Sequence, residues 1–311
     1  MNLRNFSQPI IITEVILLGF SNIHQLQKPL FFFFLVMYIL TLLCNGLVIL
    51  LIEVNHRLKT PMYYFLKNLS WMEIIITTTV TPKMLSLLIL EDNTMPFFAC
   101  VLQGYIYFVA GSSEVFLLAA MSVDRYMAIC NPLRYTSIMR TQICQLMVLS
   151  CWLWGFLSVT SSASLTMKLP FCGPNIIDHF FCDNGPVKHL ICADIHFLQT
   201  IDLAVSCFNL LGSVSVTAVS YICIVVTVMR IPSAKGRKKA FSTCSSHITV
   251  ASLYYGSSMF IYIKPAGESS TDLNKVATVL NTVVTPLLNP IIYTFRNKVV
   301  KEAVKDVLGR M

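Results

Sequence analysis

The chain has 311 residues, of which 55% are hydrophobic and only 12% are charged, and its mean hydropathy is +0.69. A soluble domain carries roughly 25% charged residues, so this composition excludes a water-soluble globular protein. The net charge of +8 is spread over short connectors between apolar segments, which argues against a nucleic-acid-binding surface and is typical of a membrane protein.

Seven apolar segments are long enough to cross the hydrocarbon core, which takes about 20 helical residues. In chain order they are Leu26–Ile52, Pro61–Leu90, Phe97–Ile129, Thr141–Thr166, Phe197–Met229, Lys239–Ile263 and Leu273–Phe295. Prolines and glycines inside several of them are compatible with membrane helices. We therefore expect an all-α fold, a single seven-helix bundle over residues 26–295 that follows an N-terminal tail of residues 1–25.

Lysine and arginine predict the orientation of this bundle. Arg57, Arg134 and Arg237 lie in the connectors after the first, third and fifth segments, and the tail of residues 296–311 is also basic. The opposite connectors hold few lysines and many acids. The positive-inside rule therefore places the N-terminus outside and the C-terminal tail in the cytosol. Asn5 begins an N-x-Ser sequon on the outer tail, where we expect glycosylation.

The C-terminal tail carries apolar pairs at a four-residue spacing between Val299 and Leu308. Charged residues separate these pairs. The pattern predicts a short amphipathic helix on the inner leaflet.

Four of the eleven cysteines fall on the predicted outer side. They are Cys100, Cys172, Cys182 and Cys192. In an oxidising compartment an even set predicts two disulfides, with three pairings open. The alternative is a metal site, because His179, His189 and His196 are interleaved with these cysteines. We favour disulfides, since extracellular thiols are usually oxidised, and we expect the histidines to be ordinary loop residues.

Motifs along the chain narrow the class of protein. "MSVDRYMAIC" (121–130) places Asp124 beside Arg125 at the end of the third segment, and "LNPIIY" (288–293) lies in the seventh. The others are "PMYYFLKNLS" (61–70), Ser220-Tyr221, "KAFSTCSSH" (239–247) and "TPLLNPIIYTFRN" (285–297). Together they resemble the rhodopsin-like class of G-protein-coupled receptors and, within it, the odorant receptor family.

The resemblance covers nearly the whole chain and has two departures. Ser122 and Val123 stand where the family's common motif M-A-Y-D-R-Y has alanine and tyrosine, and Glu73 stands where the second helix usually has aspartate. We interpret both as subfamily variation. The resemblance implies a rhodopsin-like bundle in which Cys100 pairs with Cys182 and Cys172 with Cys192, holding a lid over the outer mouth.

By the same resemblance, the inner end of the bundle is a switch. Asp124 neutralises Arg125 while the bundle is closed, and Arg125 meets a G protein once the base of the sixth helix swings outward. The implied switch residues are Asp124, Arg125, Tyr126, Tyr221, His247, Asn289, Pro290 and Tyr293. The base of the sixth helix is basic and offers Arg125 no acid. Restraint on the arginine is therefore expected from His247 or Tyr221.

Two carboxylates lie deep in the predicted membrane helices, where an ionised group costs roughly 2.5–3.5 kcal/mol on insertion scales. They are Glu73 and Glu114, which the resemblance places in the bundle interior close to Asn45 and Asn289. Both should not be ionised alone. Either they share a proton or a Na⁺ ion lies between them as a resting-state modulator; the alternative is two neutral, hydrogen-bonded acids. We hypothesise the ion and expect no other cofactor or metal.

By depth in the bundle, we expect a ligand cavity between the lid and this acidic layer. Its predicted lining is Tyr107, Phe108, Gly111, Ser112, Val205, Ser206, Asn209, Tyr255, Ser258, Met259, Tyr262, Val279 and Thr282. The set is mostly apolar, has a few hydroxyl and amide groups and carries no charge. It therefore suits a small, neutral, volatile molecule.

The resemblance implies an odorant as ligand and a stimulatory heterotrimeric G protein as partner, which raises cyclic AMP. It also implies residence in the plasma membrane of olfactory cilia. A receptor of this family that senses a metabolite outside the nose is the alternative. A retinal photoreceptor is disfavoured because Lys275 lies at the outer end of the last helix, and we find neither transporter repeats nor an enzyme motif.

Overall fold

The computed structural model describes residues 12–20, 24–90, 93–172, 174–262, 270–296 and 300–302. Asn5 and the tail beyond residue 302 lie outside the described residues, so the predicted glycosylation and most of the predicted amphipathic helix stay predictions. The side chain of Tyr262 is likewise outside the described part.

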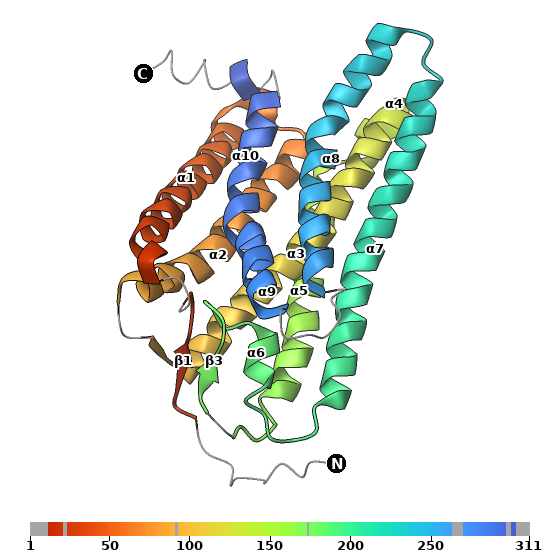
Figure 1. The fold of residues 1–311 in the computed structure, drawn as a ribbon. Coiled ribbons are helices and arrows are strands. Elements are labelled where there is room, and N and C mark those ends of the chain that lie inside the picture. Colours follow the sequence, from red (N-terminus) through yellow and green to blue (C-terminus); the bar gives the residue numbers. More distant parts are fainter. Residues whose placement is uncertain are drawn as a thin grey trace.

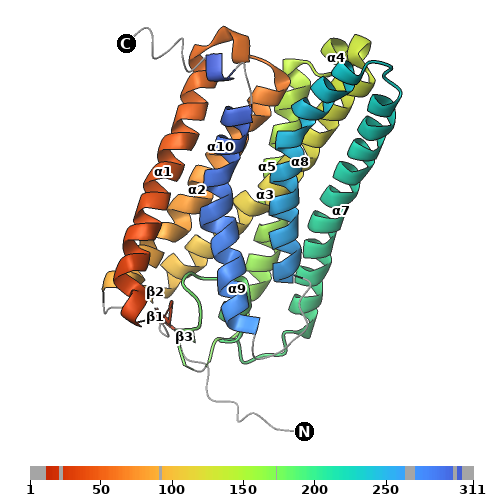
Figure 2. The ribbon, with the colours of Figure 1, turned by 45° about the horizontal axis from the view of Figure 1, so that its top comes forward.

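Long helices run alongside one another through most of the chain (Figures 1 and 2). They are α1 (Gln27–Val54), α2 (Pro61–Ile89), α3 (Phe97–Cys130), α5 (Thr141–Thr166), α7 (His196–Met229), α8 (Ala234–Tyr262) and the consecutive α9 (Ser270–Val279), π-helical η3 (Leu280–Val284) and α10 (Thr285–Arg296). Shorter helices are η1 (His24–Leu26), η2 (His56–Leu58), α4 (Pro132–Ile138) and α6 (Asn184–Lys188). The predicted all-α bundle is confirmed, although α8 begins at Ala234 rather than at Lys239.

Apolar length explains most of these helices. Among the described residues, six helices are long and apolar enough to cross a membrane, the last being Leu273–Tyr293. The predicted sixth span, α8, is not one of the six. It has 29 residues, but it begins with a basic turn and is rich in serine and tyrosine.

A small sheet lies at the end of the bundle that we call the outer end, drawn at the bottom of Figure 1. In it β1 (Glu14–Leu17) pairs antiparallel with β2 (Thr94–Pro96) and parallel with β3 (Ile176–Ile177). Val15 and Leu17 alternate with more exposed residues and are fully buried, because one face of the strand packs on the apolar outer core. The strand thus attaches the chain before α1 to the segment after α5.

Two glycines allow backbones to approach closely around α3. A Cβ at Gly155 of α5 would lie 2.7 Å from the carbonyl oxygen of Val109 on α3. One at Gly104 of α3 would lie 2.6 Å from the carbonyl oxygen of Cys182. Any larger residue would force these elements apart. The glycines fix α3 between α5 and the segment that covers the outer mouth, and a cavity lies beneath that segment.

Candidate functional site

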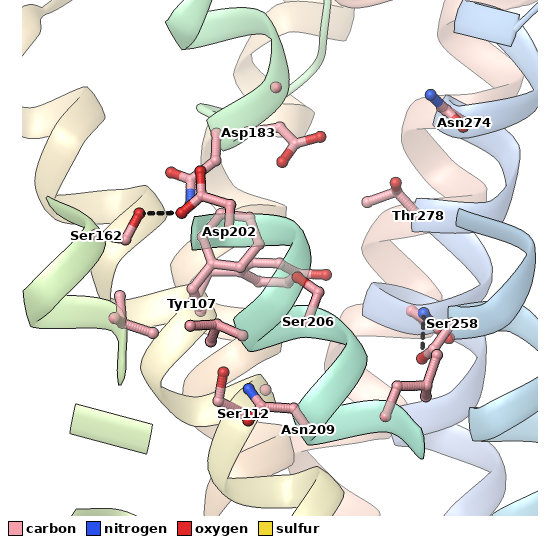
Figure 3. Close-up of a pocket in the computed structure, with 18 of the residues that line it drawn as sticks. Tyr107, Ser112, Ser162, Asp183, Asp202, Ser206, Asn209, Ser258, Asn274 and Thr278 are labelled. Carbon is pink, nitrogen blue, oxygen red and sulfur yellow. Dashed lines mark hydrogen bonds between the residues drawn. The ribbon is translucent and has the colours of Figure 1, made fainter. Parts of the chain in front are cut away.

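A cavity of about 720 Å³ lies beneath the lid, by which we mean residues 170–195 without residue 173. Its walls come from α3, α5, α7, α8, α9 and the lid, with Ile76 of α2 and Asn281 of η3 (Figure 3). Eight of the predicted ligand residues line it: Tyr107, Phe108, Gly111, Ser112, Val205, Ser206, Asn209 and Ser258. The structure thus brings the α3 and α7 residues of the predicted set together.

Four other predicted ligand residues lie outside the lining. Tyr255 is buried against α7, where its hydroxyl group is 2.5 Å from Ser213 Oγ. Thr282 donates to the carbonyl of Thr278 at 2.8 Å. Met259 packs on the apolar cluster that contains Tyr255, and Val279 packs on the cluster that contains Val283. The prediction used depth in the bundle, and depth does not determine which face of α8 or α9 a residue occupies.

The expectation of an uncharged cavity is wrong. Five charged residues line it: Glu114, Asp178, Asp183, Lys188 and Asp202. Lys188 of the lid forms an ion pair with Asp202 of α7, and Ser162 of α5 donates to Asp202 at 2.5 Å (Figure 3). The helical pattern alone could have found Asp202, since it lies one turn above Val205 and Ser206. The irregular lid gave no such signal.

Burial shifts the titration of three lid groups. It raises the pKa of Asp183 to about 6, lowers that of Lys188 to about 8 and lowers that of His179 to about 3. His179 is therefore neutral at physiological pH. It is 2% exposed and lies against the Phe180 and Phe181 rings, so it is not the ordinary loop residue that we expected.

The lid is attached at several points. Disulfides join Cys100 to Cys182 and Cys172 to Cys192, with Cα–Cα distances of 5.3 and 5.5 Å. Lys275 of α9 donates to Asp178 at 2.6 Å. Among the described residues, no group of three or more His, Cys, Asp or Glu could hold a metal ion, which leaves the metal alternative for these cysteines without support.

At the inner end, Asp124 is fully buried and neutralises Arg125. Arg125 Nε donates to Asp124 Oδ2 at 2.9 Å, and the hydroxyl of Tyr135 donates to Asp124 Oδ1 at 2.8 Å. Tyr126 packs on a small apolar cluster between α7 and α8 that contains Ile224 and Cys244. Arg125 is therefore paired within α3 itself. Tyr135 is a second partner of Asp124, which the sequence motifs did not indicate.

His247 connects three helices near Arg125. Its Nε2 lies 3.1 Å from the carbonyl oxygen of Leu118 on α3, and its Nδ1 lies 2.6 Å from the hydroxyl of Tyr221 on α7. A carbonyl can only accept, so Nε2 carries the hydrogen and Nδ1 accepts from Tyr221. His247 is fully buried on α8. The bridge holds the inner part of α8 against α3 and α7.

Polar atoms gather around Glu73 in the middle of the bundle. Asn289 Nδ2 donates to Glu73 Oε1, and Glu114 and Asn45 lie close enough to act on the charge of Glu73. Four of the buried oxygen atoms that have no hydrogen-bond partner among the described residues belong to this group: Asn45 Oδ1, Glu73 Oε2, Asn289 Oδ1 and Tyr293 OH. Pro290 is buried next to Asn289 inside α10. Such a group of oxygens fits the ligand preference of a hard cation.

The arrangement of helices is that of the rhodopsin fold. The chain superimposes on squid rhodopsin with a TM-score of 0.70, covering 92% of this chain and 86% of that one at 18% sequence identity. At this identity the likeness shows the fold alone.

The sequence comparisons define the family. The family model for olfactory receptors matches residues 34–310. The chain is 50% identical over 300 residues to mouse (Mus musculus) olfactory receptor 6E1, covering 96% of each, and 47% identical over 309 residues to human olfactory receptor 6T1, covering 99% and 95%. The protein belongs to the olfactory receptor family. It is therefore a multi-pass membrane receptor of the G-protein-coupled type and not an enzyme.

Proposed function

We propose that this receptor binds small, mostly neutral volatile molecules in the cavity beneath the lid and activates a stimulatory G protein, which raises cyclic AMP. The cavity carries the proposal. It is large enough for an odorant, and much of its wall is aromatic, aliphatic or hydroxyl-bearing. Its charged residues gather at the lid and at Glu114, and Lys188 and Asp202 neutralise each other. We place the receptor in the plasma membrane of olfactory cilia.

Signalling follows from the two ends of α3. Tyr107 and Ser112 line the cavity, and Arg125 lies about three and a half turns beyond Ser112 on the same helix. A ligand that binds the open-base conformation more tightly shifts the population toward it. In that state Arg125 leaves Asp124 and contacts the G protein. Tyr221 and Tyr293 would then stabilise the moved arginine.

The test is cyclic AMP in cells that express the receptor and its stimulatory G protein, across chemically diverse volatiles. Surface expression is measured in the same cells, and Arg125→Ala is the control. A response to at least one volatile that the control lacks supports the proposal. Silence across the panel at normal surface expression contradicts it and favours a non-volatile metabolite.

We further propose that Na⁺ binds beside Glu73 and stabilises the resting state. The unpartnered oxygens around Glu73 support this. Basal cyclic AMP should then fall as Na⁺ replaces a bulky organic cation in membranes from expressing cells. Glu73→Gln and Glu114→Gln should each reduce that effect. Basal activity that is independent of Na⁺ and unchanged in Glu114→Gln contradicts the proposal.

A further inference from the structure

One side-chain amide in the cavity wall has a fixed orientation. Trp154 Nε1 of α5 donates to Asn209 Oδ1 of α7 at 2.8 Å. An indole N–H can only donate, so the oxygen of the amide must face it. The indole is itself held by aromatic neighbours, with ring centroids 5.1 Å from Phe208 and 6.1 Å from Phe116. Asn209 therefore presents its Nδ2 hydrogens away from Trp154.

These hydrogens remain available. Asn209 lines the cavity, and no hydrogen bond joins its Nδ2 to another residue in the part of the chain that the structure describes. Asn281, on the opposite wall, differs. Its Oδ1 accepts from Ser257, and its Nδ2 donates to Ser258 Oγ at 3.4 Å. Asn209 thus keeps both of its N–H donors for a ligand, whereas Asn281 uses one of its two on Ser258.

Two hydroxyl groups lie at the same level of the cavity. Ser213 of α7 donates to the carbonyl of Val115 on α3 at 2.7 Å, so the two helices touch there. Asn209 lies one turn above Ser213, and Ser112 lies about one turn above Val115. Ser206 lines the cavity a little less than one turn further up α7. Figure 3 draws Ser112, Ser206 and Asn209 on the α3–α7 side, opposite Ser258 and Thr278.

A purely apolar ligand that filled this level would leave the Asn209 donor without a partner. An unsatisfied buried donor lowers affinity by about tenfold or more. A ligand oxygen would accept from Nδ2 and from a serine hydroxyl at once, because a carbonyl oxygen has two lone pairs. We propose that Asn209, oriented by Trp154, makes this receptor selective for carbonyl odorants, meaning ketones, esters and lactones. The inference rests on the proposed function, since it names the ligand class of the same cavity.

The test uses cyclic AMP dose–response curves with medium-chain ketones, esters and lactones. Each compound is matched to the alkane and to the amine of the same carbon skeleton. We expect the potency of the best carbonyl compound to exceed that of the matching alkane by about tenfold or more. Asn209→Asp keeps the acceptor for Trp154 but removes the donor, so it should lower carbonyl potency by about tenfold. Asn281→Asp, the matched change on the opposite wall, should preserve the preference for carbonyl over alkane.

Trp154→Phe is the second variant, for the case that Asn209→Asp does not reach the cell surface. This change frees the Asn209 amide to rotate without adding a charge. It should reduce the ratio of carbonyl potency to alkane potency by about threefold. Ketone responses unchanged in Asn209→Asp, or a preference unchanged in Trp154→Phe, would overturn the inference. So would amines that outperform ketones, because they would direct the polar end of the ligand to Glu114. A wild-type receptor that responds equally to alkanes and ketones refutes this inference alone, whereas silence toward every compound refutes the proposed function with it.

Discussion

The outer and inner ends of this receptor are held by different chemistry. At the outer end, two disulfides, a short sheet and the Lys275–Asp178 contact fasten the lid. At the inner end, hydrogen bonds such as those of His247 hold the helices together, Asp124 pairs with its neighbour Arg125, and Asp124 and His247 are both fully buried. Covalent bonds do not exchange on the timescale of signalling, whereas hydrogen bonds do. This difference is what the proposed signalling requires: a ligand would bind at a fixed outer end, and the inner end would move to contact the G protein.

Breaking the outer end should have the largest effect. Cys182→Ser removes the Cys100–Cys182 disulfide, whose cysteines are 82 residues apart in the sequence. Cys172→Ser removes the Cys172–Cys192 disulfide, whose cysteines are 20 residues apart. Removing a disulfide costs about 2–5 kcal/mol, and the loop-entropy model adds about 1 kcal/mol for the longer loop. We expect Cys182→Ser to lose more surface receptor than Cys172→Ser, measured by flow cytometry on intact cells. The exposed Cys207→Ser is the control; equal surface levels in all three variants would refute this account of the lid.

Loosening the inner end should change activity instead of folding. His247→Phe keeps an aromatic ring but removes the bonds to Leu118 and Tyr221, each worth about 1 kcal/mol. The resting state loses its bridge, so basal cyclic AMP should rise several-fold at normal surface expression. His56→Phe, at an exposed connector, is the matched control. A His247→Phe receptor with wild-type basal activity would show that the bridge does not restrain α8.

Acidity should act on the outer end with a smaller effect. Burial raises the pKa of Asp183 to about 6, above the ordinary value of 3.8, so the folded receptor binds a proton more readily than the unfolded chain. Stability from this group therefore grows as pH falls through about 6 and levels off below 3.8. The melting temperature of the purified receptor should therefore rise as the pH is lowered from 7.5 to 5.5, and Asp183→Asn should remove the part of that rise that comes from Asp183. An identical pH profile in both proteins would contradict this assignment.

The two ends also differ in how well the sequence predicts them. Apolar length and periodicity predict the long helices, and the motif around Asp124 and Arg125 predicts the ion pair that the structure contains at the inner end. The lid has no period, so the contact between Lys188 and Asp202 could not be foreseen. Thr282 was misplaced for a related reason. It lies in the π-helical η3, whose wider turn contains an extra residue and rotates the side chains away from the positions that a regular α-helix would give them.

The central claim is that a ligand acts in the outer cavity and Arg125 reports it at the inner end. Gly111 tests the first half, because a Cβ there meets nothing within 4 Å and a larger side chain would enter the cavity. We would measure basal and odorant-evoked cyclic AMP in Gly111→Phe and Arg125→Ala at matched surface expression. The account predicts that Gly111→Phe loses only the evoked signal, while Arg125→Ala loses both. A Gly111→Phe receptor that still responds to odorant with wild-type potency would contradict it.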